Sequence, residues 1–270
     1  MDKLKIYTQD DMRTFARARE GLEQVVEQAG LGRVAGGETI ADKQDNEAIL
    51  GLEASEFNQE ALRNLERYAP LVKDIGQLVR SKHIEHPQII DFGCGPAILT
   101  SLIAKELPTA RMVGVDISPD MIECAEENRI LFEVAERVHI IEHNALAVSK
   151  DSGIAFDLAT SRNMIHRVDE LADALKRMVL ATKQRGGMTR IDGFRRVDDL
   201  SNEGQLAFVA AAQQRDGEKH LKEAYIRAHL NAPTLAQYQE SALLVAKELD
   251  LADMKVWAGK SNNVSLYFER

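Results

Sequence analysis

The fold can be inferred from one segment, Ile89-Ile90-Asp91-Phe92-Gly93-Cys94-Gly95-Pro96-Ala97-Ile98. It is an apolar run that ends in an acid and continues into a turn with two spaced glycines. Such a turn predicts a backbone against which a ligand lies, because glycine tolerates left-handed conformations. A second apolar run, 112–116, also ends in an acid, and Asp116 follows Gly93 by 23 positions. Nucleotide-binding folds place their ribose-binding carboxylate roughly 20 residues after the turn, so the two runs predict one nucleotide-like ligand site.

The pattern around this stretch alternates between strands and helices, which predicts an α/β fold with helices on both faces of a mostly parallel sheet. Two closing strands joined by a short loop are expected to form an antiparallel hairpin. We therefore expect a doubly wound seven-stranded sheet with an antiparallel last strand. The expected strands are 88–92, 111–116, 138–142, 156–160, 188–192, 255–257 and 265–268, and the expected helices between them are 97–107, 120–132 and 168–181.

Two regions outside the sheet have helical patterning. Residues 1–86 are expected to form a helical N-terminal extension, either as a packing element or as a lid over a ligand. Residues 87–270 are expected to form the main domain, with a helical insert at 200–248 between the fifth and sixth strands. The expected elements are a helix from Thr8 to Gly30, a loop at 30–45, helices at 48–52, 61–68 and 71–82, and insert helices at 203–214, 218–230 and 235–248.

Composition excludes several classes of protein. A chain of 270 residues can bury a large core without a disulfide or metal. Its net charge of −9 is spread along the chain, which argues against a nucleic-acid partner. The two cysteines, Cys94 and Cys124, have no metal-ligand spacing, so we expect no metal site and a reducing, cytoplasmic location. The sequence contains no apolar run near 18 residues and no leader pattern, so neither a membrane span nor a signal peptide is expected.

The glycine turn, the acid at Asp116 and the antiparallel end resemble class I methyltransferases that depend on S-adenosylmethionine. The resemblance covers residues 87–270. The segment Ser161-Arg162-Asn163-Met164-Ile165-His166-Arg167-Val168-Asp169 is similar to the small-molecule branch of that family, in which a Ser/Asn-rich segment and a histidine follow the fourth strand. The resemblance implies S-adenosylmethionine as cofactor and methyl transfer to an oxygen, nitrogen or carbon of a small molecule.

The residues themselves favour this cofactor over NAD. NAD carries a pyrophosphate that binds backbone amides at a helix N-terminus, and Asp91 would repel it. The same acid suits the ammonium group of S-adenosylmethionine. The dinucleotide fingerprint also fails at Ile98, where its last glycine would stand. The methyltransferase pattern departs at Ala97, where the family often has a third glycine.

The resemblance assigns the cofactor contacts one position at a time. Asp116 is expected to accept both ribose hydroxyls, as a carboxylate can. Ile117 and Met121 are expected to flank the adenine, and Asn144 is either a partner of the adenine amino group or an ordinary turn residue. The complete expected cofactor set is Asp91, Gly93, Cys94, Gly95, Asp116, Ile117, Met121, Asn144, Ala145, Ser161 and Arg162.

Two ionisable residues after the fourth strand have alternative roles. His166 has a pKa suited to removing a proton near neutral pH, so it is the candidate catalytic base; alternatively it caps the following helix. Positioning alone can supply much of the acceleration of methyl transfer, so a base is not required. Arg162 either neutralises an acidic group on the donor or acceptor, or is a surface arginine.

Rival functions remain open on the sequence alone. One is a protein that binds S-adenosylmethionine for regulation or assembly, with a homodimer interface formed by the helical regions. Another is a protein or RNA methyltransferase with an exposed, basic-rimmed groove. The segment after the fourth strand has no Asn/Asp-Pro-Pro-Tyr motif, and the chain has no Pro-Cys nucleophile, which argues against methylation of nucleic-acid bases. A small molecule is the expected acceptor.

Overall fold

The computed structural model describes residues 54–147, 155–168, 170–197, 200–201, 203–204, 207, 230–259 and 262–270. The elements expected before residue 54 lie outside this range, as do nearly all residues of the insert helices expected at 203–214 and 218–230. No helix within the described ranges is long and apolar enough to cross a membrane.

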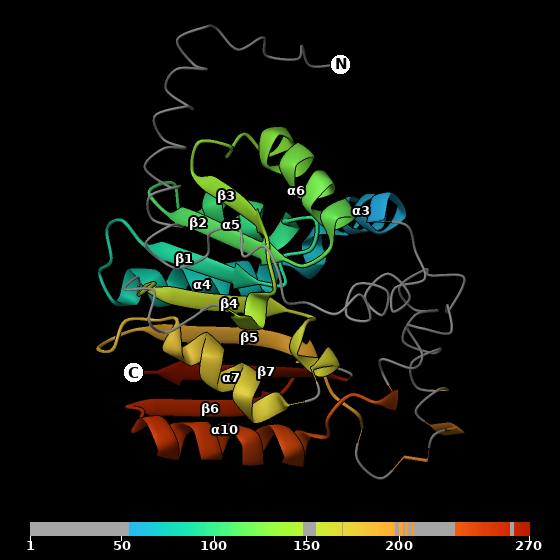
Figure 1. Cartoon of the computed structure of the whole chain (residues 1–270), viewed down its shortest axis with the longest axis vertical. Coiled ribbons are helices and arrows are strands. Elements are labelled where there is room, and N and C mark those ends of the chain that lie inside the picture. The colour runs from blue at the N-terminus through green and yellow to red at the C-terminus, as the bar shows by residue number, and fades with distance from the viewer. Residues whose placement is uncertain are drawn as a thin grey trace, which may run out of the picture.

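A single seven-stranded sheet forms the centre of the structure, with the strand order β3-β2-β1-β4-β5-β7-β6 (Figure 1). β7 runs antiparallel to both of its neighbours, and the other pairs are parallel. The expected doubly wound sheet with an antiparallel last strand is therefore confirmed. The strands are β1 (Gln88–Phe92), β2 (Arg111–Asp116), β3 (Val138–Glu142), β4 (Leu158–Arg162), β5 (Met188–Phe194), β6 (Asp253–Ala258) and β7 (Asn263–Glu269).

The chain reverses its direction of progress across the sheet between β1 and β4, which pair with each other at the centre. From β1 the chain adds β2 and β3 on one side, and then returns to add β4 and β5 on the other. Ligands of open α/β sheets bind at such a reversal, outside the carboxyl ends of the strands. The topology alone thus places a candidate site beside the ends of β1 and β4.

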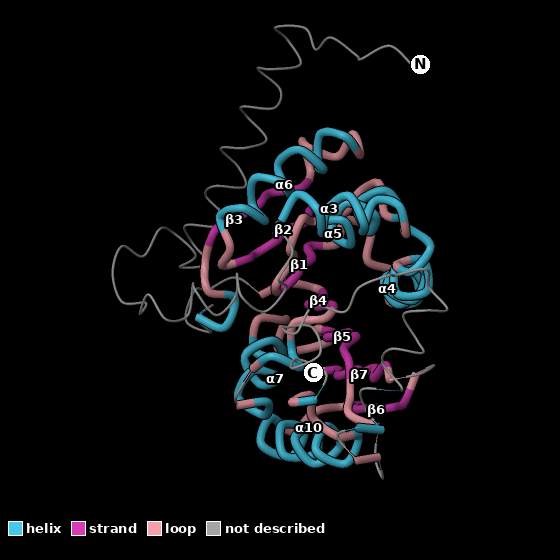
Figure 2. The backbone as a smooth tube through the Cα atoms, turned by 90° about the vertical axis from the view of Figure 1, so that its right-hand side faces the viewer, coloured by secondary structure: helices cyan, strands magenta, loops and turns pink. Residues whose placement is uncertain are grey.

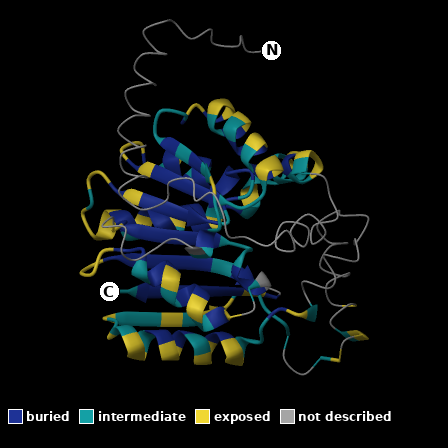
Figure 3. Cartoon of the chain, viewed as in Figure 1, coloured by how far each residue is buried: buried dark blue, intermediate teal, exposed yellow. Residues whose placement is uncertain are grey.

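Helices cover both faces of the sheet, and Figure 2 shows α4 and α7 on opposite sides of it. Buried side chains of α4, α5 and α6 pack on one face, and those of α7 and α10 pack on the other. The strands other than the edge strand β6 are largely buried, whereas the outer faces of the helices are exposed (Figure 3). The helices are α3 (Ala54–Arg63), α4 (Ala69–Ser81), α5 (Ile98–Glu106), α6 (Pro119–Leu131), α7 (Leu171–Leu180) and α10 (Leu235–Leu249).

Two helices begin with a side-chain cap. The Ser118 side chain accepts a hydrogen bond from the backbone N–H of Met121 at 3.4 Å, and Pro119 begins α6. Thr234 and Gln237 form a reciprocal capping box at the start of α10. Both caps were readable from the sequence because their partners lie within three residues.

The expected fourth strand was placed two residues too early. β4 begins at Leu158, and Phe156 makes only an isolated bridge to Thr182. The buried Asp157 lies between the two, and its side chain accepts a hydrogen bond from the backbone N–H of Gln88 at 2.9 Å. β4 consequently extends to Arg162, which lies at the carboxyl end of the strand.

Other helix and strand boundaries also differ from the ranges expected from the sequence. α7 begins at Leu171 instead of 168, because residues 165–167 form a separate 3-10 turn and Val168 is extended. α5 begins at Ile98, since Ala97 has a left-handed backbone. β5, β6 and β7 each run past the expected ranges, because cross-strand pairing continues over residues that lack an apolar pattern.

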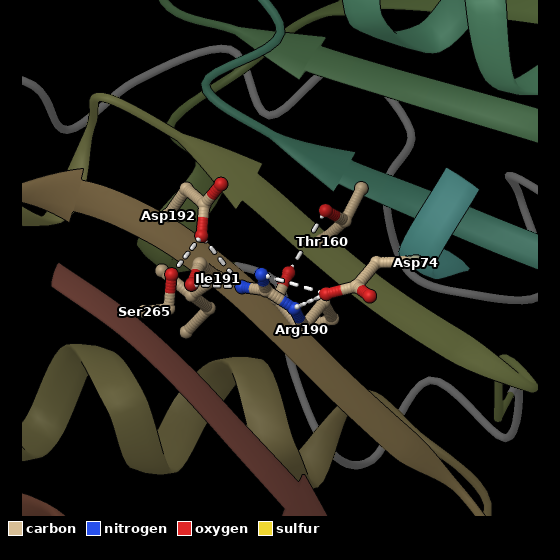
Figure 4. A network of polar contacts seen from close by, with 6 residues as sticks. All are labelled: Asp74, Thr160, Arg190, Ile191, Asp192 and Ser265. Atoms are coloured by element: carbon tan, nitrogen blue, oxygen red, sulfur yellow. Dashed lines mark hydrogen bonds and ion pairs between the residues drawn. The ribbon is translucent and has the colours of Figure 1, made fainter. Parts of the chain in front are cut away.

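A buried arginine joins α4 to the last three strands of the sheet (Figure 4). Arg190 of β5 is 4% exposed, and its Nε and Nη2 lie 3.1 and 3.0 Å from Oδ2 of Asp74 on α4. Its Nη1 donates to Oδ1 of Asp192 at 2.6 Å, which also accepts from Ser265 Oγ on β7 at 2.6 Å. The guanidinium lies 4.9 Å from the ring centroid of Trp257 on β6. The network therefore fixes how α4 sits against this half of the sheet.

Candidate functional site

The turn after β1 is held against β2 by a hydrogen bond of 3.0 Å from Cys94 N–H to the carbonyl of Val115. Gly93 and Gly95 have φ angles of +65° and +53°, in the left-handed region that glycine adopts without a steric penalty. A Cβ on Gly93 would lie 2.8 Å from Cγ of Met164, whereas a Cβ on Gly95 would meet no atom within 4 Å. Gly93 thus allows close packing, and Gly95 borders open space.

Ala97 occupies a third left-handed position in this turn. Its φ and ψ angles are 54° and 30°, it is fully buried, and it is the N-cap residue of α5. An alanine in this conformation costs roughly 1–2 kcal/mol, because its Cβ crowds the following carbonyl oxygen. The departure from the expected third glycine at this position therefore retains the backbone shape and leaves the turn strained.

Asp91 is a buried carboxyl group beside the turn and is 1% exposed. Its Oδ2 accepts a hydrogen bond of 2.6 Å from Thr100 Oγ1 on α5. Its Oδ1 is buried and has no hydrogen-bond partner within the described part of the chain. The pKa of this carboxyl is raised to about 7, chiefly by burial. The hydrogen bond from Thr100 and the charge of Arg162 oppose the rise, and the charge of Asp116 contributes to it. A buried acceptor of this kind suits a cationic or N–H donor on a ligand.

The structure brings Asp116 to the same turn, as the spacing of the two strands predicts. Its Oδ2 accepts a hydrogen bond of 2.7 Å from Gly95 N–H, and its Oδ1 accepts one of 3.0 Å from Ser118 N–H. The carboxylate therefore lies between the glycine turn and the start of α6. An ionised carboxylate only accepts hydrogen bonds, which suits the hydroxyl groups of a ligand.

The residues expected around an adenine ring lie just after β2 and β3 and, for Met121, in the first turn of α6. Met121 and Ala145 are each 7% exposed, and Ile117 is half-buried. Asn144 uses its Oδ1 to accept from Leu146 N–H at 2.9 Å, as a turn residue does. The side chain thus makes one hydrogen bond within the turn. A second lone pair on its amide oxygen and its amide N–H groups can still form hydrogen bonds with a ligand.

The end of β4 contributes two residues with different surroundings. Ser161 is fully buried, and its Oγ donates a hydrogen bond of 2.8 Å to the carbonyl of Phe92, which joins the ends of β4 and β1. Arg162 instead extends over the ring of Tyr68, with its Cζ 4.4 Å from the ring centroid. Ser161 therefore supports the turn through a strand contact, and Arg162 is only half-buried.

His166 lies in the 3-10 turn at 165–167 and is 4% exposed. Its ring packs edge-to-face on Phe194 of β5, with the centroids 5.2 Å apart and an interplanar angle of 71°. The N-cap position of the next helix, α7, is held by Glu170 and not by His166. The catalytic role of His166 stays a prediction.

Three residues beside the site were missed in the sequence. Tyr68 is the N-cap residue of α4, Thr100 lies on α5, and Asn128 lies on α6. A signal was available for Tyr68: a helix that precedes the first strand of such a fold runs back along it, so its first residues lie at the carboxyl edge of the sheet. Thr100 and Asn128 are single polar residues in apolar helix faces and carry no comparable local signal. Among the described residues, no cluster of His, Cys, Asp and Glu is arranged to hold a metal ion.

A glycine turn after β1, an acid at the end of β2 and the strand reversal beside them define an α/β protein with a nucleotide-type cofactor site. Residues 90–188 match the protein family described as "Methyltransferase domain". This range covers the turn, Asp116 and the strands β2 to β4, which are the parts that build the candidate site.

Curated relatives share parts of this region. The chain is 30% identical over 163 residues to release factor glutamine methyltransferase of Fusobacterium nucleatum, covering 57% of this chain and 45% of that protein. It is 35% identical over 75 residues to trans-aconitate 2-methyltransferase of Streptomyces avermitilis, covering 28% of this chain and 26% of that protein. The chain thus spans less than half the length of either relative.

Solved structures share the fold over a longer range. The plantazolicin methyltransferase BpumL, in complex with a monoazolic desmethylPZN analog and SAH, has a TM-score of 0.64 at 11% identity and covers 94% of this chain and 99% of its own. An O-methyltransferase-like structure from Nostoc punctiforme has a TM-score of 0.58 at 19% identity and covers 95% of this chain and 69% of its own. At these identities the likeness is one of fold.

Residues 90–188 therefore form a methyltransferase domain, and its fold is that of the class I S-adenosylmethionine-dependent methyltransferases. S-Adenosylmethionine is the cofactor of this family, and the site fits it in two respects. The buried Oδ1 of Asp91 offers an acceptor to an ammonium group, and the open space at Gly95 leaves room for a ligand against the backbone. No residue of the turn presents a cation that would favour a pyrophosphate instead.

Proposed function

We propose that this chain is an enzyme that transfers a methyl group from S-adenosylmethionine to an oxygen, nitrogen or carbon atom of a small molecule. The observation that carries the proposal is the buried, unpartnered Oδ1 of Asp91 beside the open face of Gly95, within the described residues. A buried acceptor without a partner is costly, and a ligand that donates to it removes the cost.

The proposed cofactor contacts follow the geometry of the turn. Asp91 accepts from the ammonium group, and Gly93, Cys94 and Gly95 provide the backbone surface along the amino-acid part. Asp116 accepts from the ribose hydroxyls, because an ionised carboxylate accepts hydrogen bonds and this one lies at the turn, bonded to Gly95 and Ser118. The adenine side is formed by Ile117, Met121, Asn144 and Ala145.

S-Adenosylmethionine, when bound, supplies a methyl group that is activated by the positive charge on its sulfur. The task of the protein is then to hold the acceptor in line and to exclude water. Ser161 fixes the end of β4 against β1, where the acceptor is expected to lie. His166, buried against Phe194, is the proposed base for an acceptor that must lose a proton.

A protein acceptor is the second candidate function. The observation that favours it is the 163-residue match to release factor glutamine methyltransferase, a longer match than the one to trans-aconitate 2-methyltransferase.

Both Cys94 and Cys124 are free, which supports a reducing compartment and hence our proposal of a cytoplasmic location. That location is shared by small-molecule and protein acceptors, so it does not decide between them.

Calorimetric titration with S-adenosylhomocysteine tests the cofactor assignment, and labelled S-adenosylmethionine tests the acceptor. We expect binding that is weakened by Asp116→Ala, and label transfer into the low-molecular-mass fraction of a cell extract. Transfer into the protein fraction would favour the second candidate. Binding without any transfer would favour a regulatory role, and no binding at all would remove the cofactor assignment.

A His166→Ala variant tests the proposed base. Full turnover of this variant on the identified acceptor would exclude a role of His166 as base.

A further inference from the structure

A tyrosine from the segment before β1 supports an arginine at the end of β4. Tyr68 is the N-cap residue of α4, and Arg162 is the last residue of β4. The guanidinium carbon lies 4.4 Å from the centroid of the Tyr68 ring, which is 8% exposed. Stacking on an aromatic face restricts the guanidinium to one plane without using its N–H groups.

The side-chain donors of this pair have no acceptor among the described residues. Over the described ranges, the side chains of Arg162 and Tyr68 form no hydrogen bond or ion pair; their mutual stacking is the contact that holds them. Arg162 is half-buried, so part of its fork of N–H groups is accessible. A fixed guanidinium with free N–H groups matches the two oxygens of a carboxylate, and the phenol O–H of Tyr68 adds a third donor.

The pair lies next to the buried acid of the site. Asp91 pairs with Thr160 in the register of β1 and β4, and Arg162 follows Thr160 by two residues, so Asp91 and Arg162 lie on the same face of the sheet. Their charges interact, because Arg162 opposes the rise in the pKa of Asp91. The edge of the sheet therefore presents a negative group and a positive group on adjacent strands. This is the arrangement that complements an amino acid with its ammonium and carboxylate groups.

We propose that Arg162 and Tyr68 form a carboxylate-binding site at the carboxyl edge of β4. The proposal rests on the proposed function, since the ligand reaches this edge when the cofactor site is used. Two sources can supply the carboxylate: the amino-acid end of the methyl donor, or an acidic acceptor. In either case Tyr68 makes the segment before β1 part of the binding site.

Calorimetry with four proteins tests the proposal: the unaltered chain, Arg162→Gln, Tyr68→Phe and the control Arg111→Gln. Arg111 is exposed at the start of β2, at the opposite edge of the sheet, so its substitution removes the same charge away from the site. The first probe is S-adenosylhomocysteine, compared with its decarboxylated analogue. The second is a set of carboxylates, namely succinate, citrate, glutamate and trans-aconitate, titrated in the presence of saturating S-adenosylhomocysteine.

If the donor supplies the carboxylate, Arg162→Gln weakens binding of S-adenosylhomocysteine by about ten- to a hundred-fold and leaves the affinity of the decarboxylated analogue unchanged. Tyr68→Phe, which keeps the ring, gives a smaller loss in the same direction. If the acceptor supplies the carboxylate, S-adenosylhomocysteine binds Arg162→Gln as tightly as it binds the unaltered chain. One of the carboxylates then binds the unaltered chain but not Arg162→Gln. Arg111→Gln changes neither measurement.

The proposal is overturned if the unaltered chain and Arg162→Gln bind S-adenosylhomocysteine with equal affinity and also bind the carboxylates equally. Failure of the unaltered chain to bind S-adenosylhomocysteine is a separate result, which refutes the proposed function. Thermal unfolding of each variant checks that it folds. Should Arg162→Gln fail to fold, Arg162→Lys retains the charge and removes the planar fork, so the comparison with the decarboxylated analogue is made with that variant.

Discussion

The side chains of Asn58 and Asn128 form a hydrogen bond of 2.7 Å, which joins α3 to α6. The same amide nitrogen of Asn128 donates a second bond of 2.7 Å to the carbonyl of Pro96 in the glycine turn. Both asparagines are buried. Asn128 therefore uses both of its N–H groups to connect the segment before β1 with the turn that forms the cofactor site.

Replacing Asn128 tests this connection. Asn128→Ala leaves the Pro96 carbonyl and Asn58 Oδ1 without their donor, so we expect a loss of about 2–3 kcal/mol in the free energy of unfolding. The affinity for S-adenosylhomocysteine should fall as well, because the turn loses one of its fixed points. Urea denaturation and calorimetry measure the two effects. Asn58→Ala is the control that keeps the bond to Pro96; a stability change below about 0.5 kcal/mol for Asn128→Ala would contradict the prediction.

The raised pKa of Asp91 leads us to expect that the free energy of unfolding decreases as the pH rises. Its pKa is about 7 in the folded chain and close to 3.8 in the unfolded chain. Between these values the folded state keeps a proton that the unfolded state loses, so this group makes the protein less stable as the pH rises from 4 to 7. The effect is on the order of 4 kcal/mol in total. Denaturant unfolding at a series of pH values should show the slope in the unaltered chain and a flatter curve for Asp91→Asn.

The same group predicts proton release on cofactor binding. An ammonium group beside Asp91 favours the ionised carboxylate and lowers its pKa, so binding of S-adenosylhomocysteine near pH 6.5 should release a proton. Calorimetry in buffers of different ionisation enthalpy measures this release. The exposed Asp120 on α6 provides the control Asp120→Asn, which should behave like the unaltered chain. Equal proton release by Asp91→Asn would show that another group is responsible.

The two glycines of the turn should respond differently to alanine. Gly93→Ala combines a positive φ with a contact of 2.8 Å to Met164, so we expect a loss of roughly 2–4 kcal/mol in stability. Gly95→Ala has only the backbone cost of roughly 1–2 kcal/mol. Its methyl group, however, fills the open space at the turn, so affinity for S-adenosylhomocysteine should fall about ten-fold or more. Undiminished binding by Gly95→Ala would place the ligand elsewhere.

Ala97→Gly should stabilise the protein. The left-handed backbone at this position is strained for alanine, and relief of that strain exceeds the extra entropy of glycine in the unfolded chain. We expect a gain of about 0.5–1 kcal/mol, measured as a shift of the urea midpoint at constant slope. Ala125→Gly in the middle of α6 is a suitable contrast, because a helical alanine gains nothing from this change and the substitution should destabilise.

The parts of the fold that the sequence predicts are those whose causes are local. Apolar runs locate the strands, and Ser118 and Thr234 locate the starts of two helices. The start of β4 was misplaced because Phe156 pairs with Thr182 in an isolated bridge instead of joining the strand, and that partner is distant in the sequence. The insert helices before residue 230 and the expected homodimer stay predictions, as does the division of the chain at residue 86.

The candidate site was predictable to the extent that it is built from strand ends. Gly95 and Asp116 meet because β1 and β2 are neighbours, which the order of elements implies. Thr100 and Asn128 reach the site through the packing of helices, and helix packing leaves little signal at a single position. For the same reason the stacking of Arg162 on Tyr68 was not foreseen, although Arg162 itself was expected at the site.

The sequence contains one tryptophan, and the network of Arg190 gives it a particular use. Trp257 is 39% exposed, and its ring contacts the same guanidinium that binds Asp74 of α4. Indole emission depends on the charge and water around the ring, so loss of the contact between α4 and β5 would change it. The protein therefore carries an intrinsic fluorescent reporter of whether the helix that bears Tyr68 is docked on the sheet, and this state can be followed in solution without any added label.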